Sequence, residues 1–415
     1  MNQYLAKYGF QSSTIIESPD INLGLIVVIP CFNEPDIIGS INSLQTAVKP
    51  KTSVEVIVVV NNGNHHSDAI KNQNLKSIAD LKNHKIESSP LFKLHIIEAL
   101  DLPKKHAGVG LARKIGMDEA VARFEINEND GLIVCFDADS TCDSNYFIAI
   151  ENHFKKHSKS AGAAIKFEHP IEGTDFDESI YEGIINYELF LRYYNQGLKH
   201  ANLPFAFHTV GSSMVVRSSA YQKQGGMNKR KAGEDFYFLH KIISLGGFTE
   251  INTTKVIPSP RTSDRVPFGT GKAISDWIED ETTEYLTYDV RIWEILRDFQ
   301  SQISTLHTTD LIDLDFSKNP INKQFLDFLD LNEFEKGLKE IRSNSTSLET
   351  FTKRFYAWFN AFRVLKLVHY LRDKQFPNQA ILNQAKLMAK QRGFFDDETS
   401  TKELLKSYRL FESID

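Results

Sequence analysis

Short apolar runs rich in Val, Ile and Leu recur along the first half of the chain, and each ends at a polar or turn-forming residue. The runs at residues 23–29, 54–60 and 131–136 are too short and too rich in β-branched residues for helices, so they predict buried strands. Stretches with helical spacing, such as residues 108–124 and 145–156, lie between or after them. Strands that alternate with helices predict βαβ units, and therefore a mostly parallel sheet with helices on its faces.

The third run ends abruptly in Asp137-Ala138-Asp139. Successive side chains of a strand point to opposite faces, so Asp137 and Asp139 are expected to point the same way where the strand ends. Two carboxylates at the carboxyl edge of such a sheet can hold a hard divalent cation that carries phosphates. The alternative interpretation is an Asp-rich turn that binds nothing.

Composition excludes some classes of function. The chain has 415 residues, 41% of them hydrophobic and 25% charged, which is typical of a globular protein with room for two or three domains. Its net charge of −6 argues against a general nucleic-acid binder, which would normally be basic. We therefore expect no nucleic-acid partner.

The cysteines and the hydropathy pattern indicate a cytoplasmic setting. Cys31, Cys135 and Cys142 are odd in number and form no C-x-x-C pair, which suits a reducing compartment. No stretch approaches the roughly 18–20 apolar residues of a membrane-spanning helix. The first residues also lack the pattern of a signal peptide. We expect a cytoplasmic protein without a transmembrane segment, and the sequence leaves peripheral membrane contact open.

The character of the sequence changes beyond about residue 275, where long helical patterns replace the β-branched runs. One apolar stripe, which predicts the core of a helical domain, consists of Leu348, Phe351, Phe355, Phe359, Phe362, Leu365 and Val368. We predict an N-terminal arm at 1–20, an α/β domain at 21–272 and an all-α C-terminal domain at 273–415. The last domain could bind a substrate, form a homo-oligomer or brace the rest.

Several motifs occur in the order found in one enzyme family. They are Pro30-Cys-Phe-Asn33-Glu34, Asn61-Asn62-Gly63, Gly108-Val-Gly-Leu-Ala-Arg113-Lys-Ile-Gly116, Asp137-Ala138-Asp139, Gly211-Ser212-Ser213-Met214 and Gly233-Glu234-Asp235. Across residues 23–270 the chain therefore resembles the family 2 glycosyltransferases. The resemblance implies the GT-A fold, a Rossmann-like, mostly parallel mixed sheet flanked by helices. Each motif alone is a weak signal, whereas their joint order is a strong one.

The resemblance also implies an activity and a set of site residues. It implies inverting transfer of a sugar from a nucleotide diphosphate sugar to a hydroxyl group, as in polysaccharide biosynthesis. A carbohydrate, a lipid-linked sugar and a small metabolite all remain open as acceptors. The predicted donor-binding residues are Pro30, Asn33, Glu34, Asn61, Asn62, Arg113, Asp137, Ala138, Arg261 and Arg265. The predicted acceptor-binding residues are Gly211, Ser212 and Ser213.

The chemistry of glycosyl transfer assigns the acidic residues. A divalent cation, Mn²⁺ or Mg²⁺, held by Asp139 and Asp137 would neutralise the departing nucleoside diphosphate. The acceptor hydroxyl needs a base, which we predict to be Asp235, with Glu234 orienting it or binding the acceptor. Base and metal on opposite sides of the anomeric carbon predict inversion. The alternative is that Glu234 and Asp235 are only acids at a helix N-terminus.

Two positions depart from the family pattern. Asn61-Asn62 stand where an aspartate usually reads the nucleotide base, and this leaves UDP, GDP and dTDP donors open. The segment Pro258–Arg261 contains no histidine to complete a metal site, so either the metal would keep an extra water or the charge of Arg261 would help in place of the histidine. No Q-x-x-R-W motif is visible, which argues against a processive polysaccharide synthase.

Two other functions compete with this prediction. A sugar-1-phosphate nucleotidyltransferase would need a Gly-rich basic loop after its first strand, but Pro30–Glu34 contains no glycine. A non-catalytic relative that only binds nucleotide sugar is the second alternative. The joint presence of Asp137, Asp139 and Asp235 argues against it.

Overall fold

The computed structural model describes residues 2–85, 91–263, 269–279, 284–310, 323–394 and 400–414. The chain forms two compact units. The first contains the chain up to Tyr181 together with Thr209–Ser275, and the second contains Glu182–His208 together with Asp276–Ser413. The second unit therefore takes a segment from the middle of the chain.

The first unit is built on an eight-stranded mixed sheet with the strand order β3-β2-β1-β4-β7-β6-β8-β5. The bounds are β1 (Leu23–Cys31), β2 (Ser53–Gly63), β3 (Phe92–Leu102), β4 (Leu132–Cys135), β5 (Thr141–Cys142), β6 (Gly162–Phe167), β7 (Met214–Arg217) and β8 (Thr249–Ile257). β3, β2, β1 and β4 run parallel to one another, and β6 pairs in parallel with β8. The pairs β4–β7, β7–β6 and β5–β8 are antiparallel. The predicted α/β fold with a mostly parallel mixed sheet is confirmed.

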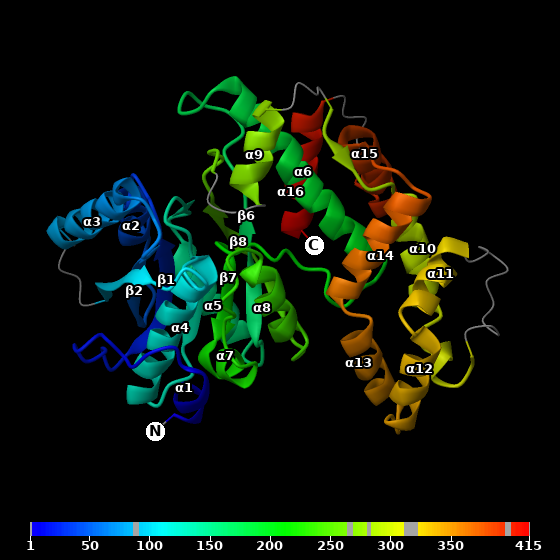
Figure 1. The fold of residues 1–415 in the computed structure, drawn as a ribbon, viewed down its shortest axis with the longest axis horizontal. Helices are drawn as coiled ribbons and strands as arrows, with labels where there is room; N and C mark the ends of the chain where they lie inside the picture. Colours follow the sequence, from blue (N-terminus) through cyan, green and yellow to red (C-terminus); the bar gives the residue numbers. More distant parts are fainter. Residues whose placement is uncertain are drawn as a thin grey trace. The chain divides into compact units, whose positions relative to one another are not determined.

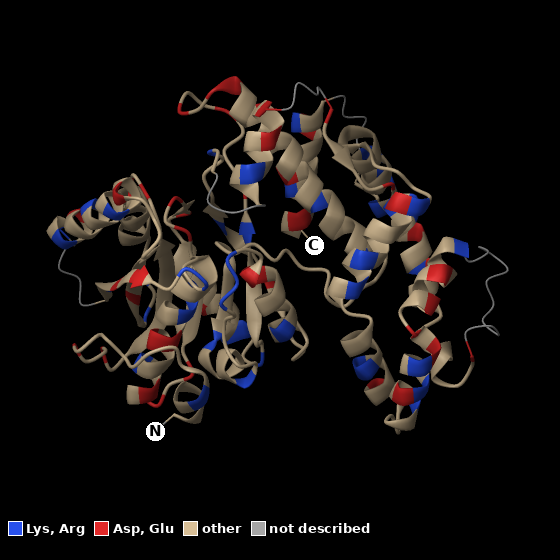
Figure 2. Ribbon diagram, in the orientation of Figure 1, with Lys and Arg blue, Asp and Glu red and all other residues tan. Residues whose placement is uncertain are grey.

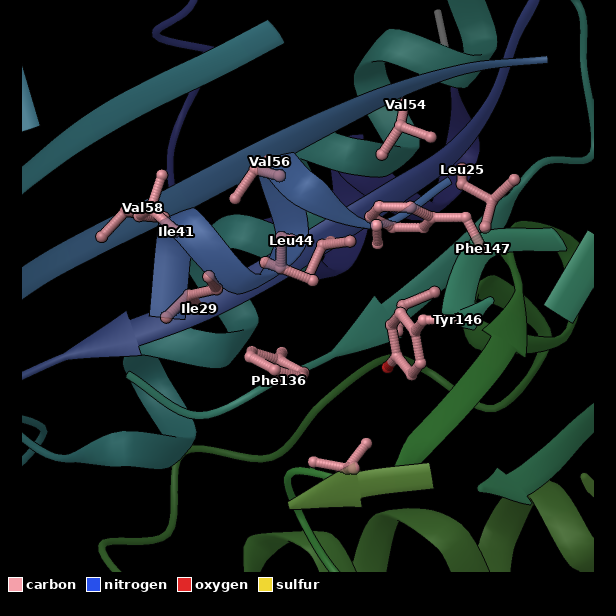
Figure 3. Packing of buried hydrophobic residues seen from close by; sticks show 14 of the residues in the cluster. Leu25, Ile29, Ile41, Leu44, Val54, Val56, Val58, Phe136, Tyr146 and Phe147 are labelled. Carbon is pink, nitrogen blue, oxygen red and sulfur yellow. The ribbon is translucent and has the colours of Figure 1, made fainter. Parts of the chain in front are cut away.

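Burial on both faces explains why the first strands read as continuous apolar runs. Every residue of β2 is buried, and Val54, Val56 and Val58 belong to the same core cluster as Ile41 and Leu44 (Figure 3). Full burial of one such aliphatic side chain contributes about 1.5–3 kcal/mol to stability. The strands that carry the site are therefore held by the most apolar part of the sequence.

Helices pack on this sheet, and α4 lies against β1 and β2 (Figure 1). The helices of the first unit are α1 (Gln3–Tyr8), α2 (Ile37–Thr46), α3 (Asp68–Asn83), α4 (Val109–Ile126), α5 (Tyr146–Lys156), α7 (Ser218–Lys223) and α8 (Glu234–Ile243). Gly116 permits the close approach of α4, because a Cβ there would lie 2.5 Å from Cγ1 of Val28. The last glycine of the α4 motif thus has a packing role.

The second unit is helical. It comprises most of α6 (Glu178–His200), the end of α9 (Thr270–Glu279), α10 (Arg291–Ser301), the 3₁₀ turn Thr305–His307, α11 (Lys323–Leu331), α12 (Phe334–Ser343), α13 (Leu348–Trp358), α14 (Ala361–Lys374), α15 (Ile381–Arg392) and α16 (Thr401–Ile414). The two-residue strands β9 (Leu286–Thr287) and β10 (Gln379–Ala380) form one short antiparallel ladder. The predicted helical C-terminal region is confirmed. No helix in the described residues is long and apolar enough to cross a membrane.

The predicted apolar stripe is interrupted where α13 gives way to α14. Phe351, Phe355 and Phe359 are buried, but Phe362 is 39% exposed. The chain leaves the helix after Trp358 and starts α14 with a new N-cap, so the helical phase is not continuous across the break. In α14 the apolar face consists of Val364, Leu367, Val368 and Leu371.

Buried charges tie α6 to the last helix of the second unit. The guanidinium of Arg192 pairs with Glu188 of its own helix and with Glu412 of α16, and Arg409 donates to Glu188 at 2.7 Å. Burial opposes ionisation of Glu412, but Arg192 and His208 outweigh it and lower its pKa to about 2. This network explains why a mid-chain helix belongs to the second unit.

Candidate active site

One buried arginine joins two of the predicted motifs. Arg113, in the second turn of α4, is 3% exposed and donates a hydrogen bond to Oδ1 of Asp137 at 2.5 Å. Its other terminal nitrogen donates to Glu234 at the start of α8. Burial disfavours the charged form of Arg113, but Asp137 and Glu234 outweigh it and raise its pKa. The end of β4 and the start of α8, nearly 100 residues apart, therefore share one cation.

Gly211 makes room for this arginine. A Cβ at position 211 would lie 2.5 Å from Nη1 and 2.8 Å from Cζ of Arg113. Any larger residue would have to displace the guanidinium, because both groups are enclosed. The glycine that sequence analysis placed on the acceptor side thus lies directly against Arg113.

The loop after β4 buries its alanine and leaves its two aspartates partly exposed. Ala138 is buried, whereas the side chains of Asp137 and Asp139 are 36% and 26% exposed. The hydroxyl of Ser40 in α2 donates to the carbonyl oxygens of Ala138 at 2.8 Å and Ser140 at 2.7 Å. Helix α2 therefore fixes the backbone that carries both carboxylates.

A second arginine connects Asp139 to the loop after β1. Arg261 donates from Nη1 to Oε1 of Glu34 at 2.9 Å, and its Nη2 lies 2.9 Å from Oδ2 of Asp139. Burial disfavours the charged form of Arg261, but Glu34 and Asp139 raise its pKa. Glu34 is itself only 1% exposed. The D-x-D segment thus faces a guanidinium at each carboxylate.

Helix α3 holds the loop that carries Asn33 and Glu34. Asn33 has a φ of 49°, in the left-handed region that asparagine tolerates, and its N–H donates to Oδ1 of Asn74 at 2.8 Å. Ser77 and Gln73 donate to the carbonyl oxygen of Glu34 at 3.0 and 2.7 Å. Sequence analysis missed these supporting residues, because isolated polar side chains on a helix are normally interpreted as facing solvent.

Asp235 lies in the first turn of α8, behind Gly233, whose φ of 66° suits glycine. Burial raises the pKa of the Asp235 carboxyl, although Arg113 opposes the rise. Burial likewise raises the pKa of Glu234, again against the pull of Arg113. A carboxylate with a raised pKa is a stronger proton acceptor than an ordinary one.

The local charge balance is acidic. Two guanidiniums, Arg113 and Arg261, face the five carboxyl groups at 34, 137, 139, 234 and 235. With every carboxyl ionised, the difference is three negative charges. Oxygen ligands that are partly exposed and surrounded by excess negative charge fit a hard divalent cation at Asp137 and Asp139. In the described part of the chain no group of three His, Cys, Asp or Glu residues is placed to hold a metal, so water or phosphate would complete its shell.

The remaining predicted residues lie at the edges of this site. Asn61 and Asn62 are buried at the end of β2, and Oδ1 of Asn62 accepts from the N–H of Asp101 at 2.8 Å. Oδ1 of Asn61 is buried without a hydrogen-bond partner among the described residues. This amide oxygen can therefore accept a further hydrogen bond. The hydroxyls of Ser212 and Ser213 lie 3.3 Å apart and are buried.

Pro30 and Arg265 are the two other residues predicted to bind the donor. Pro30 lies within β1 and pairs with Val59 of β2. Arg265 lies outside the described residues.

Comparison with known proteins assigns the family. Residues 26–225 match the family described as Glycosyl transferase family 2. This part of the chain is a family 2 glycosyltransferase domain. The resemblance deduced from the motifs is confirmed, and the protein is a glycosyltransferase. Glu234, Asp235 and Arg261 lie beyond the matched residues, so their connection to the domain rests on the contacts with Arg113, Glu34 and Asp139.

Solved structures with similarity to this chain include S. aureus TarS 1-349 in complex with UDP-GlcNAc, with a TM-score of 0.39 and 16% identity, covering 94% of this chain and 90% of that one. The same fragment in complex with UDP has a TM-score of 0.37 and 15% identity, with the same coverage. S. aureus TarS has a TM-score of 0.34 and 15% identity, covering 84% of this chain and 55% of that one. These scores are too low to transfer a ligand or a role. No curated protein matches the chain.

Proposed function

We propose that the protein is an inverting, metal-assisted glycosyltransferase that moves a sugar from a nucleotide diphosphate sugar to a hydroxyl acceptor. The observation that supports this most is the pairing of Arg113 with both Asp137 and Glu234. It puts the D-x-D segment and the Glu234-Asp235 pair on either side of one guanidinium. A leaving diphosphate and an attacking hydroxyl need neighbouring groups of these two kinds.

The donor would lie along the carboxyl ends of β1, β2 and β4. The unpartnered amide oxygen of Asn61 can accept a hydrogen bond from a nucleotide base. Mn²⁺ or Mg²⁺ held by Asp139 and Asp137 would supply charge neutralisation for the leaving diphosphate. Arg261 would move from its carboxylate partners toward the phosphates, for which a guanidinium is well shaped.

The acceptor would approach on the side of α8. Asp235 takes the proton of the acceptor hydroxyl, and its raised pKa suits that role. Glu234 is held by Arg113, so it orients Asp235 or binds the acceptor and does not take the proton. Gly211, Ser212 and Ser213 would line this side. Attack from the face opposite the leaving group inverts the anomeric carbon.

The test combines a donor panel with one matched pair of variants. UDP-, GDP- and dTDP-sugars are incubated with Mn²⁺, and released nucleoside diphosphate is measured. We expect one donor to be turned over and Asp235→Asn to lower that turnover about 10²–10⁴-fold. The donor-induced thermal shift should remain in this variant. Asp80→Asn, a carboxylate of α3 away from these contacts, serves as the control.

Two results would oppose the proposal. Full turnover by Asp235→Asn would exclude this residue as the base. Absence of diphosphate release with every donor would favour the non-catalytic alternative.

A further inference from the structure

Basic residues gather on two loops beside α8 that the proposed chemistry does not use. Lys104 and Lys105 follow β3, and Lys229-Arg230-Lys231 lead into α8. Figure 2 shows blue segments gathered between α4 and α8. We call Lys71, Lys104, Lys105 and Lys231 the basic patch.

The two loops lie side by side. The N–H of Gly110 donates to the carbonyl oxygen of Arg230 at 3.2 Å. A Cβ on Gly108 would lie 3.0 Å from Cγ of Lys231. Because the same loop continues into Glu234 and Asp235, the patch adjoins the predicted catalytic base.

The positive charge of the patch is largely unbalanced. Lys71 pairs with Asp101 at 3.1 Å, whereas Lys104, Lys105 and Lys231 have no acidic partner among the residues that the structure describes. The histidine pair His65-His66 lies near Lys71 and Lys231. Burial together with nearby lysines lowers the pKa of both histidines, so the lysines supply the positive charge at neutral pH.

We propose that the basic patch binds phosphate groups of the acceptor, so that the acceptor is a polyanion. This inference rests on the proposed function and names the class of its acceptor. The donor diphosphate already has Arg261 and the predicted cation site, which leaves the lysines for a second anionic ligand. Exposed lysines on flexible stems suit a chain of repeated charges better than one fixed phosphate. Such a patch also raises the local concentration of an anionic acceptor near Asp235.

The test uses labelled inorganic polyphosphate as the probe and neutral dextran as its uncharged counterpart. Binding is measured by fluorescence anisotropy without divalent cations, at several salt concentrations, with and without saturating UDP. We expect polyphosphate but not dextran to bind, and UDP to leave this binding in place. Lys104→Ala/Lys231→Ala should weaken polyphosphate binding about tenfold and reduce its salt dependence.

The control variant is Lys156→Ala/Lys159→Ala, which removes two exposed lysines of the same unit at the end of α5. It should bind polyphosphate like the unmodified protein, and thermal unfolding checks that both double variants are folded. Unchanged binding by Lys104→Ala/Lys231→Ala, or displacement of polyphosphate by UDP, would overturn the inference. Because this assay needs no turnover, its result is separate from the donor-panel result, which alone tests the transferase proposal.

Discussion

Removing the charge of Arg113 should destabilise the first unit by a predictable amount. Arg113→Met leaves Asp137 and Glu234 without their shared cation in a largely buried site. Loss of one partner of a buried ion pair costs about 3–5 kcal/mol of unfolding free energy. Glu234→Gln should cost less, about 1–2 kcal/mol, because an amide oxygen can still accept from the guanidinium.

The double variant Arg113→Met/Glu234→Gln separates pairing from packing. It removes one of the two carboxylates that Arg113→Met leaves unpaired. The loss of unfolding free energy in the double variant should therefore be about 1–3 kcal/mol smaller than the sum of the losses in the two single variants. Urea unfolding is followed by hydrogen exchange of peptides from β4 and α8. Tryptophan fluorescence would be the wrong probe, because Trp277, Trp293 and Trp358 all belong to the second unit.

Two results would refute this reasoning. A cost below about 1 kcal/mol for Arg113→Met would mean that the guanidinium is not the buried partner of both carboxylates. Additive costs in the double variant would mean that Arg113 and Glu234 do not interact. A third variant, Arg113→Lys, tests geometry, since an ammonium cannot reproduce the forked pairing.

Three further predictions follow from the same contacts. Transfer should be lost as the pH falls through the raised pKa of Asp235, because only the ionised carboxylate accepts a proton. In a pH–rate profile, the acidic limb should lie above the usual pKa range of aspartate. Removal of divalent cations by EDTA should lower turnover, Mn²⁺ should restore it, and Asp139→Ala should abolish the restoration, whereas equal rates with and without chelator would contradict the metal assignment. Arg192→Met should destabilise the second unit by about 3–5 kcal/mol, measured by the fluorescence of Trp293, because Glu412 would lose its cation; an unchanged urea midpoint would contradict this.

Much of the first unit could be predicted because its signals are local. The alternation of short β-branched runs with helical stretches depends on neighbouring residues alone, and β1, β2 and β4 begin within a residue or two of the predicted runs. Asp137 and Asp139 could be assigned to a sheet edge for the same reason. The order of the motifs then identified the family.

The partners inside the site could not be predicted in the same way. Nothing near Glu34 in the sequence indicates Arg261, 227 positions away, and nothing near Arg113 indicates Glu234. Asn74, Ser77 and Ser40 support the site from helices whose polar positions look solvated when read alone. The basic patch likewise exists only because the loop after β3 packs beside the loop before α8.

The sequence by itself determined the strands β1, β2 and β4, the helical character of the C-terminal region, the family and the identity of the acidic residues, since periodicity and motif order are properties of contiguous residues. Only the tertiary structure decided which cation each acid faces, and which unit α6 joins. Coulomb energy and burial depend on distances between atoms, and these distances are set when segments far apart along the chain pack together.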